Sequence, residues 1–106
     1  MMFDKFCIEK ILSGKKTVTR RLPRGRQPAR VGKIHKLKIY RTKKTFGSIL
    51  ITDCHLSLVK EINDKEAQKE GFNSRKEYID YFMKVNNIDI LSDYDLLWRV
   101  EFQLLL

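Results

Sequence analysis

The sequence ILSGKKTVTRR, residues 11–21, marks the point at which one structural period gives way to another. Before Gly14, apolar residues recur at helical spacing and predict a helix over residues 4–13, with Asp4 placed to cap its first turn. After Gly14, KTVTRRL alternates and is rich in β-branched residues, which predicts a short strand with two chemically different faces. We therefore expect a helix-to-strand junction at Gly14, where glycine ends the helix.

The rest of the chain predicts more strands and two more helices. Three further alternating segments predict strands, in KIHKLKIYR, SILITDCHLSLVKEI and LLWRVEFQLL. Capping-box patterns that begin at Asn63 and Ser74 predict the helices. PRGRQPARVGK predicts a loop, and KKTF predicts a turn before Gly47. Because helices and strands do not alternate regularly, the pattern favours an α+β fold, a small mixed or antiparallel barrel flanked by about three helices.

Length and composition limit the class of protein. The chain has 106 residues, which suits a single domain over residues 1–106. No apolar run approaches the length of a membrane span, and charges interrupt the N-terminus where a signal peptide would be apolar. Two cysteines, Cys7 and Cys54, are fewer than a disulfide-dependent secreted domain usually has. We expect a cytoplasmic protein without membrane contact.

The net charge of +9 is concentrated in the N-terminal half. Residues 1–50 hold fifteen Lys or Arg and two Asp or Glu, whereas residues 51–106 hold seven and eleven. The two halves therefore carry net charges of +13 and −4. This concentration predicts an electropositive face whose default partner is a polyanion such as RNA. The alternative is a solvated face that binds nothing.

Two segments resemble known binding motifs, but the spacing of their residues does not match those motifs. GKKT lacks the earlier glycine of a phosphate-binding loop, because Glu9 occupies that position. Cys54 and His55 are adjacent, and no Cys-x-x-Cys or His-x-x-x-His pair exists to complete a zinc site. We expect Cys54 to fill the core instead. The sequence therefore predicts no metal site and no cofactor.

The set with catalytic potential lies at the helix-to-strand junction just after Gly14 and consists of Lys16, Thr17, Thr19 and Arg21. A lysine activates a nearby hydroxyl when burial and neighbouring cations leave its amine neutral. The surrounding basic residues would also stabilise an oxyanion. The alternative is an ordinary edge strand whose charges face water, and the residue pattern alone favours this second interpretation.

The segment ILSGKKTVTRR resembles the opening signature of the ASCH domain family, a PUA-like β-barrel group associated with RNA. Gly14, Lys16 and Arg21 match the family pattern Gly-x-Lys-x-x-Glu-x-Arg in register. Thr19 stands where many members carry Glu, and this departure resembles the small bacterial N4-acetylcytidine amidohydrolases of the family. PARVGKIHKLKIY and LLWRVEFQ are similar to later family segments. The resemblance implies four barrel strands, over residues 16–21, 34–41, 47–56 and 97–104.

In that subgroup the catalytic set is a Lys, a Thr and a downstream Glu. The resemblance implies Lys16, Thr19 and Glu70 here, and Glu66 is the second choice for the acid. The implied function is amide hydrolysis of N4-acetylcytidine, free or in RNA. The alternatives are a non-catalytic RNA-binding module and, third, a ribonuclease. We assume a monomer whose partner is RNA or a modified nucleoside. The residues expected to bind this partner are Lys15, Arg20, Arg21, Arg24, Arg26, Arg30, Lys36, Lys38 and Tyr40.

Overall fold

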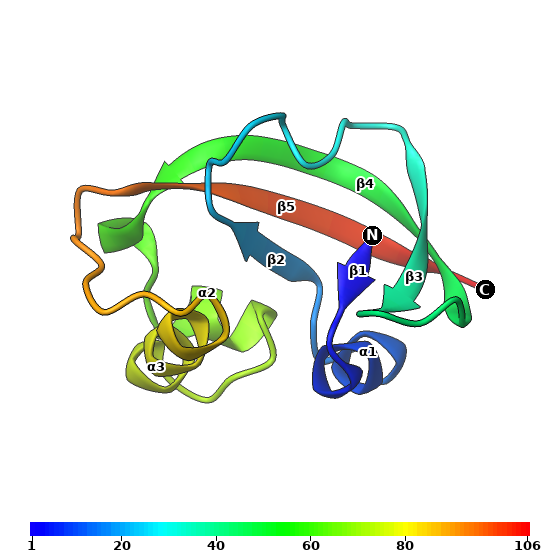
Figure 1. Cartoon of the computed structure of the whole chain (residues 1–106), viewed down its shortest axis with the longest axis horizontal. Helices are drawn as coiled ribbons and strands as arrows, with labels where there is room; N and C mark the ends of the chain where they lie inside the picture. Colours follow the sequence, from blue (N-terminus) through cyan, green and yellow to red (C-terminus); the bar gives the residue numbers. More distant parts are fainter.

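The computed structural model describes residues 1–106 and shows a five-stranded mixed sheet with three α-helices (Figure 1). In chain order the elements are β1 (Met2–Phe3), α1 (Lys5–Leu12), β2 (Val18–Arg21), β3 (Ile34–Ile39), β4 (Thr45–Leu58), a short 3-10 helix (Val59–Glu61), α2 (Asp64–Lys69), α3 (Arg75–Val85) and β5 (Leu96–Leu105). The long strands β4 and β5 run across the molecule, and α2 and α3 lie together near one end of them. The predicted α+β class and its three helices are confirmed.

The sheet has two free edges. Its strand order, β1-β3-β4-β5-β2, leaves β1 and β2 at the edges. β1 pairs with β3 in parallel, and the other three pairings are antiparallel. No backbone ladder joins β1 to β2, so the expected barrel is not closed. Arg21 spans this seam between β1 and β2 instead, because its Nη2 donates a hydrogen bond to the Met2 carbonyl at 2.9 Å.

The helices begin at the residues that the sequence predicts. The Asp4 carboxylate accepts a hydrogen bond from the Cys7 amide at 2.7 Å. Asn63 and Ser74 cap α2 and α3 in the same way. Gly14 follows α1 with a φ of +83°, in the left-handed region that favours glycine. These short-range contacts fix where each helix begins, and Gly14 marks where α1 ends.

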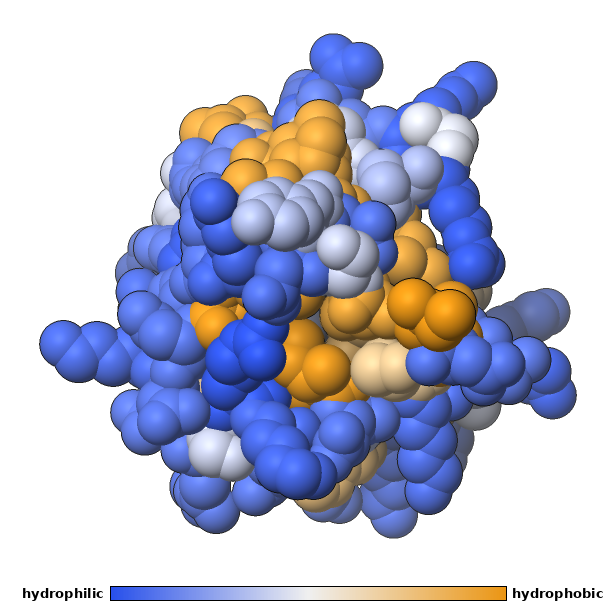
Figure 2. Space-filling view, turned by 90° about the vertical axis from the view of Figure 1, so that its left-hand side faces the viewer, coloured by the Kyte–Doolittle hydropathy of each residue, from blue (hydrophilic) through white to orange (hydrophobic).

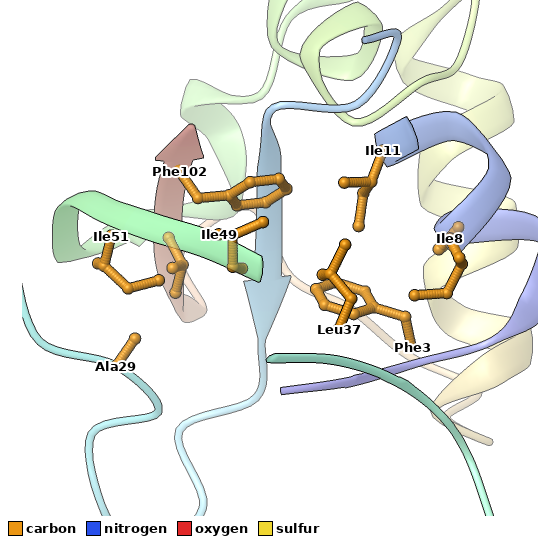
Figure 3. Packing of buried hydrophobic residues seen from close by; sticks show 10 residues of the cluster. Phe3, Ile8, Ile11, Ala29, Leu37, Ile49, Ile51 and Phe102 are labelled. Atoms are coloured by element: carbon orange, nitrogen blue, oxygen red, sulfur yellow. The ribbon is translucent and has the colours of Figure 1, made fainter. Parts of the chain in front are cut away.

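The buried hydrophobic side chains form two clusters. The larger lies between the sheet and α1 (Figure 3) and contains Phe3, Cys7, Ile8, Ile11, Ala29, Leu37, Ile49, Ile51, Val100 and Phe102. The smaller joins α2 and α3 to the start of β5 and contains Val59, Ile62, Ala67, Phe72, Tyr78, Phe82 and Leu97. β5 contributes to both clusters, so one strand holds both helical regions in place.

Several details differ from the expectations. β1 was not predicted, because two residues carry no periodic signal. β2 begins two residues later than expected, since the Lys16 amide still bonds to the Lys10 carbonyl. β4 begins at Thr45, inside the segment KKTF where a turn was expected, and it continues through Gly47, which has a φ of +117°. Leu97 is buried although it falls in the same alternating set as the polar residues Arg99 and Glu101, because residues of α2 and α3 cluster around it. Ala29, in the predicted loop, is part of the core.

Apolar side chains also gather on the surface at the end where α3 meets β5. They line a hollow of about 350 Å³ between the 88–97 segment and Leu22, with Ile90 and Tyr94 strongly exposed. Figure 2 shows this end of the molecule, where hydrophobic residues lie among hydrophilic ones. None of the helices has both the length and the apolar character that crossing a membrane requires.

Candidate active site

A buried carboxylate binds two buried cations where β2 approaches α2. Glu70, the residue that ends α2, is only 1% exposed, and Lys16 and Arg20 are 3% and 4% exposed. The Lys16 ammonium lies 2.6 Å from Glu70 Oε1, and Arg20 Nη1 lies 3.0 Å from Oε2. Each carboxylate oxygen thus has its own cationic donor. This satisfies charges that would be costly to bury alone.

Backbone hydrogen bonds bring these distant segments together. The Thr17 amide donates to the Lys69 carbonyl at 2.8 Å, which fixes the start of β2 against the end of α2. The Lys16 ammonium also donates to the Val18 carbonyl at 2.8 Å. The Lys16 side chain therefore reaches forward to the first residue of β2 and into the contact with Glu70. The short β2 strand and the last turn of α2 place this ion pair.

The ion pair lines a cleft of about 140 Å³. Thr19 lines the same cleft and is 5% exposed. Its hydroxyl takes part in none of the hydrogen bonds among Lys16, Arg20 and Glu70. The structure therefore brings the three predicted catalytic residues to one place, although their catalytic roles stay predictions. The other lining residues come from β1, α1, β2, α3 and nearby loops: Met2, Phe3, Asp4, Cys7, Arg20, Arg21, Tyr40, Tyr78, Tyr81, Phe82, Val85 and Asn86.

Two tyrosines of α3 form a wall that the sequence did not predict as part of a site. The Tyr81 hydroxyl donates to Asp4 and lies 3.2 Å from Cys7 Sγ, so it ties α3 to the start of α1. Burial, and then the nearby charge of Glu70, hold the pKa of Tyr78 well above its ordinary value. Both phenols therefore remain neutral hydrogen-bond donors. A tyrosine-rich apolar face on α3 was the only available sequence signal.

Glu66, the second choice for the acid, belongs to an ion-pair network beside the cleft and does not line it. Its Oε1 lies 2.6 Å from Arg20 Nη2 and 2.7 Å from Arg99 Nε, and its Oε2 lies 3.2 Å from Lys69 Nζ. Burial alone would raise the pKa of Glu66, but hydrogen bonds from these three cations outweigh it and lower the pKa to about 2. Glu66 therefore fixes the position of the Arg20 guanidinium, which in turn binds the Glu70 carboxylate.

This depressed pKa predicts a specific acid sensitivity. Because the pKa of Glu66 falls from 4.5 to about 2 on folding, its contribution to stability is present above pH 4.5 and is lost as pH drops toward 2. We expect the wild-type free energy of unfolding to fall over this window by about 1–2 kcal/mol more than that of Glu66→Gln, allowing for solvent screening. Urea titrations between these pH values measure it, and parallel curves for the two proteins would contradict it.

The residues predicted to bind substrate or RNA separate into three groups. Arg20 is buried in ion pairs, so it is not a surface contact. Arg21 lines the cleft, with its guanidinium 4.8 Å from the centre of the Phe3 ring, and Tyr40, 55% exposed, stands at the same opening. The remaining residues are exposed or, for Lys38, half-buried: Lys15, Arg24, Arg26, Arg30, Lys36 and Lys38.

Part of this basic surface is concave. Arg26, Arg30, Lys33 and His35 line an open hollow of about 550 Å³, here called the basic hollow, and no carboxylate lines it. None of its three permanent cations forms an ion pair with an acidic side chain. Burial, and then the charge of the N-terminal ammonium, lower the pKa of His35. The arrangement offers uncompensated positive charge to an anionic ligand.

Comparisons with known proteins agree with this architecture. A family model described as "ASCH domain" matches residues 1–105. An ASCH domain from Lactobacillus crispatus superposes with a TM-score of 0.70 at 19% identity, covering 93% of this chain and 70% of that one. Protein EF3133 from Enterococcus faecalis gives 0.74 at 14% identity, covering 96% and 68%.

The hypothetical protein PH0355 gives a TM-score of 0.67 at 20% identity and covers 99% of this chain and 96% of its own. At these identities the solved structures show the fold alone. Among curated proteins, none matches the sequence. No three His, Cys, Asp or Glu side chains are grouped so as to hold a metal ion.

Proposed function

Because this chain belongs to the ASCH domain family, we propose that its cleft hydrolyses the acetyl amide of N4-acetylcytidine, either as the nucleoside or within RNA. The observation that supports this most is the buried Lys16–Glu70 ion pair, which lines the same cleft as Thr19. A nucleophile, a cation and a proton carrier then face one enclosed space. These are the groups that acyl transfer requires.

The size and walls of the cleft suit one planar base. Its volume, about 140 Å³, is below the range for ligands of drug size, so it favours a single ring system over a whole nucleotide. Tyr78, Tyr81 and Phe82 supply aromatic surface against which a base can stack. The ribose would remain outside the opening, near Tyr40.

The charges of the resting site suggest how the roles divide. Thr19 Oγ attacks the acetyl carbonyl carbon while the Glu70 carboxylate takes the hydroxyl proton. The Lys16 ammonium stabilises the resulting oxyanion. Collapse breaks the C–N4 bond, Glu70 passes its proton to the leaving amine, and cytidine departs from an acetyl-threonine ester. Water then hydrolyses the ester to acetate and restores the threonine hydroxyl.

The direct test is incubation of the folded protein with N4-acetylcytidine and with an acetylated RNA oligonucleotide. Chromatography would measure the release of cytidine and of acetate. We expect the two products in equal amounts. If neither substrate is consumed by protein whose folding has been verified by circular dichroism, the proposal is wrong for this chemistry.

Binding of RNA without catalysis is a second candidate function, and the basic hollow favours it. An open surface with three unpaired cations and no acid matches the phosphate-tracking grooves of single-strand-binding proteins. No observation favours the ribonuclease alternative. The two leading candidates are compatible, because the cleft and the hollow share no lining residue.

Paired substitutions test the hollow. Arg26→Ala with Arg30→Ala should weaken binding of single-stranded RNA about tenfold or more and reduce the magnitude of the log–log salt slope by about 1.4, roughly 0.7 per phosphate contact. The control is Lys65→Ala with Lys84→Ala, which removes two positive charges from exposed lysines of the C-terminal half. Fluorescence anisotropy at several salt concentrations measures both. Equal losses in the two double variants would mean that net charge alone, and not the hollow, drives binding.

A further inference from the structure

Lys10 lies in the last turn of α1 and reaches to the residue that follows Glu70. Its ammonium lies 4.0 and 4.1 Å from the ring centres of Phe6 and Phe72. The same ammonium donates a hydrogen bond to the Gly71 carbonyl. Two aromatic faces and one carbonyl oxygen thus hold this cation. Lys10 therefore joins α1 to the turn that carries Glu70.

The backbone of the same residue holds Lys16. The Lys10 carbonyl accepts hydrogen bonds from the amides of Lys15 and Lys16, at 2.9 and 3.1 Å. It also accepts one from the Ser13 hydroxyl at 3.1 Å. One residue consequently contacts both backbone segments whose side chains meet in the Lys16–Glu70 ion pair.

The contact between Lys10 and Gly71 depends on the absence of a side chain at Gly71. This glycine has a φ of +93°, and a Cβ added to it would lie 2.6 Å from Lys10 Cδ. The apolar stem of Lys10 therefore lies directly against the turn after α2. The hydrogen bond from its ammonium to the Gly71 carbonyl links this stem to the turn.

We propose that Lys10 is a positioning residue that sets the separation between the Lys16 ammonium and the Glu70 carboxylate. Its carbonyl fixes the approach to β2, and its ammonium fixes the turn at the end of α2. The two partners of the ion pair cannot drift apart while both contacts hold. The effect on catalysis rests on the proposed hydrolase function, whereas the effect on geometry does not.

A structural measurement tests the geometry without any substrate. Lys10→Met keeps an unbranched apolar stem between the two rings and removes the donor, whereas Lys10→Arg keeps a cation. Lys5→Met, at an exposed lysine of the same helix, is the matched control. The readout is the NMR scalar coupling across the hydrogen bond from the Thr17 amide to the Lys69 carbonyl, 2.8 Å long in the wild type. We expect Lys10→Met to lose this coupling and Lys5→Met to retain it.

A kinetic measurement tests the consequence for the reaction. We expect Lys10→Met to lower kcat for N4-acetylcytidine about tenfold with KM changed less than about twofold, because the cleft walls stay in place while the reacting groups are misplaced. Lys10→Arg should recover most of kcat. A residue that served stability alone would lose activity only in proportion to unfolded protein.

The outcomes separate the two proposals. Retention of the Thr17 coupling in Lys10→Met, or its loss in Lys5→Met as well, overturns the positioning role. If Lys10→Met loses the coupling but keeps full kcat, the position of Lys10 is not important for the reaction. Loss of the coupling in a protein that never hydrolyses N4-acetylcytidine supports the geometric role and rejects the proposed function.

Discussion

Replacing Glu70 by alanine is expected to lower the free energy of unfolding by about 3–5 kcal/mol. The change removes the carboxylate that Lys16 and Arg20 share, so it leaves the almost completely buried Lys16 without a counter-charge and Arg20 with Glu66 alone. An uncompensated buried charge costs far more than the pair contributes when it is complete. Urea denaturation followed by circular dichroism measures the loss.

The matched control for this prediction is Glu9→Ala. Glu9 is an exposed acid of α1, so its removal changes the net charge equally and is expected to alter stability by less than about 0.5 kcal/mol. Glu70→Gln, which keeps the shape and one of the two acceptor oxygens, should fall between the two. A loss below about 1 kcal/mol for Glu70→Ala would show that the two cations find water or other partners, and that the ion pair is not a structural requirement.

Thr19→Val is expected to reduce kcat/KM for N4-acetylcytidine by about 10³-fold or more, with little effect on stability. Valine has nearly the same shape as threonine and lacks the hydroxyl that the proposed mechanism uses as its nucleophile. The hydroxyl takes part in none of the hydrogen bonds that hold Lys16, Arg20 and Glu70 together, so its removal leaves none of these groups unsatisfied. Steady-state kinetics together with a thermal melt check both halves of this expectation.

Two neighbouring substitutions sharpen this result. Thr19→Ser keeps a hydroxyl and should retain measurable turnover. Thr17→Val makes the same chemical change at an exposed position two residues away and should leave kcat/KM within about threefold of the wild type. Full activity in Thr19→Val would assign the attack to a water molecule and remove threonine from the catalytic set, even if the cleft is the true site.

Local signals in the sequence predicted the framework of the fold well. Asp4, Asn63 and Ser74 are helix caps that act within three residues of themselves, and each was found where the pattern placed it. Val100 and Phe102 alternate with polar neighbours and enter the core as expected. Such features depend on residues that are close together in the chain, so a single segment of sequence is enough to predict them.

Features that depend on distant segments were not predictable in this way. Arg20 looked like a surface cation, but it is buried because Glu66 and Glu70 reach it from α2. The contact between Tyr81 and Asp4 joins residues 77 positions apart. The local sequence around either residue does not predict its contact with the other. The placement of Glu70 at the cleft rested on a family resemblance, since nothing in its local pattern distinguishes it from Glu66.

The unclosed side of the barrel has a mechanical consequence. Elsewhere, neighbouring strands are held by ladders of backbone hydrogen bonds, but at this side the link includes the flexible arm of Arg21, resting on Phe3 and bonded to Met2. Rotation of the Arg21 side chain toward solvent breaks no backbone hydrogen bond between strands and does not require the helices to move. The entrance can thus widen for a larger ligand by breaking the contacts of one side chain, without breaking the ion pairs of Glu70 with Lys16 and Arg20.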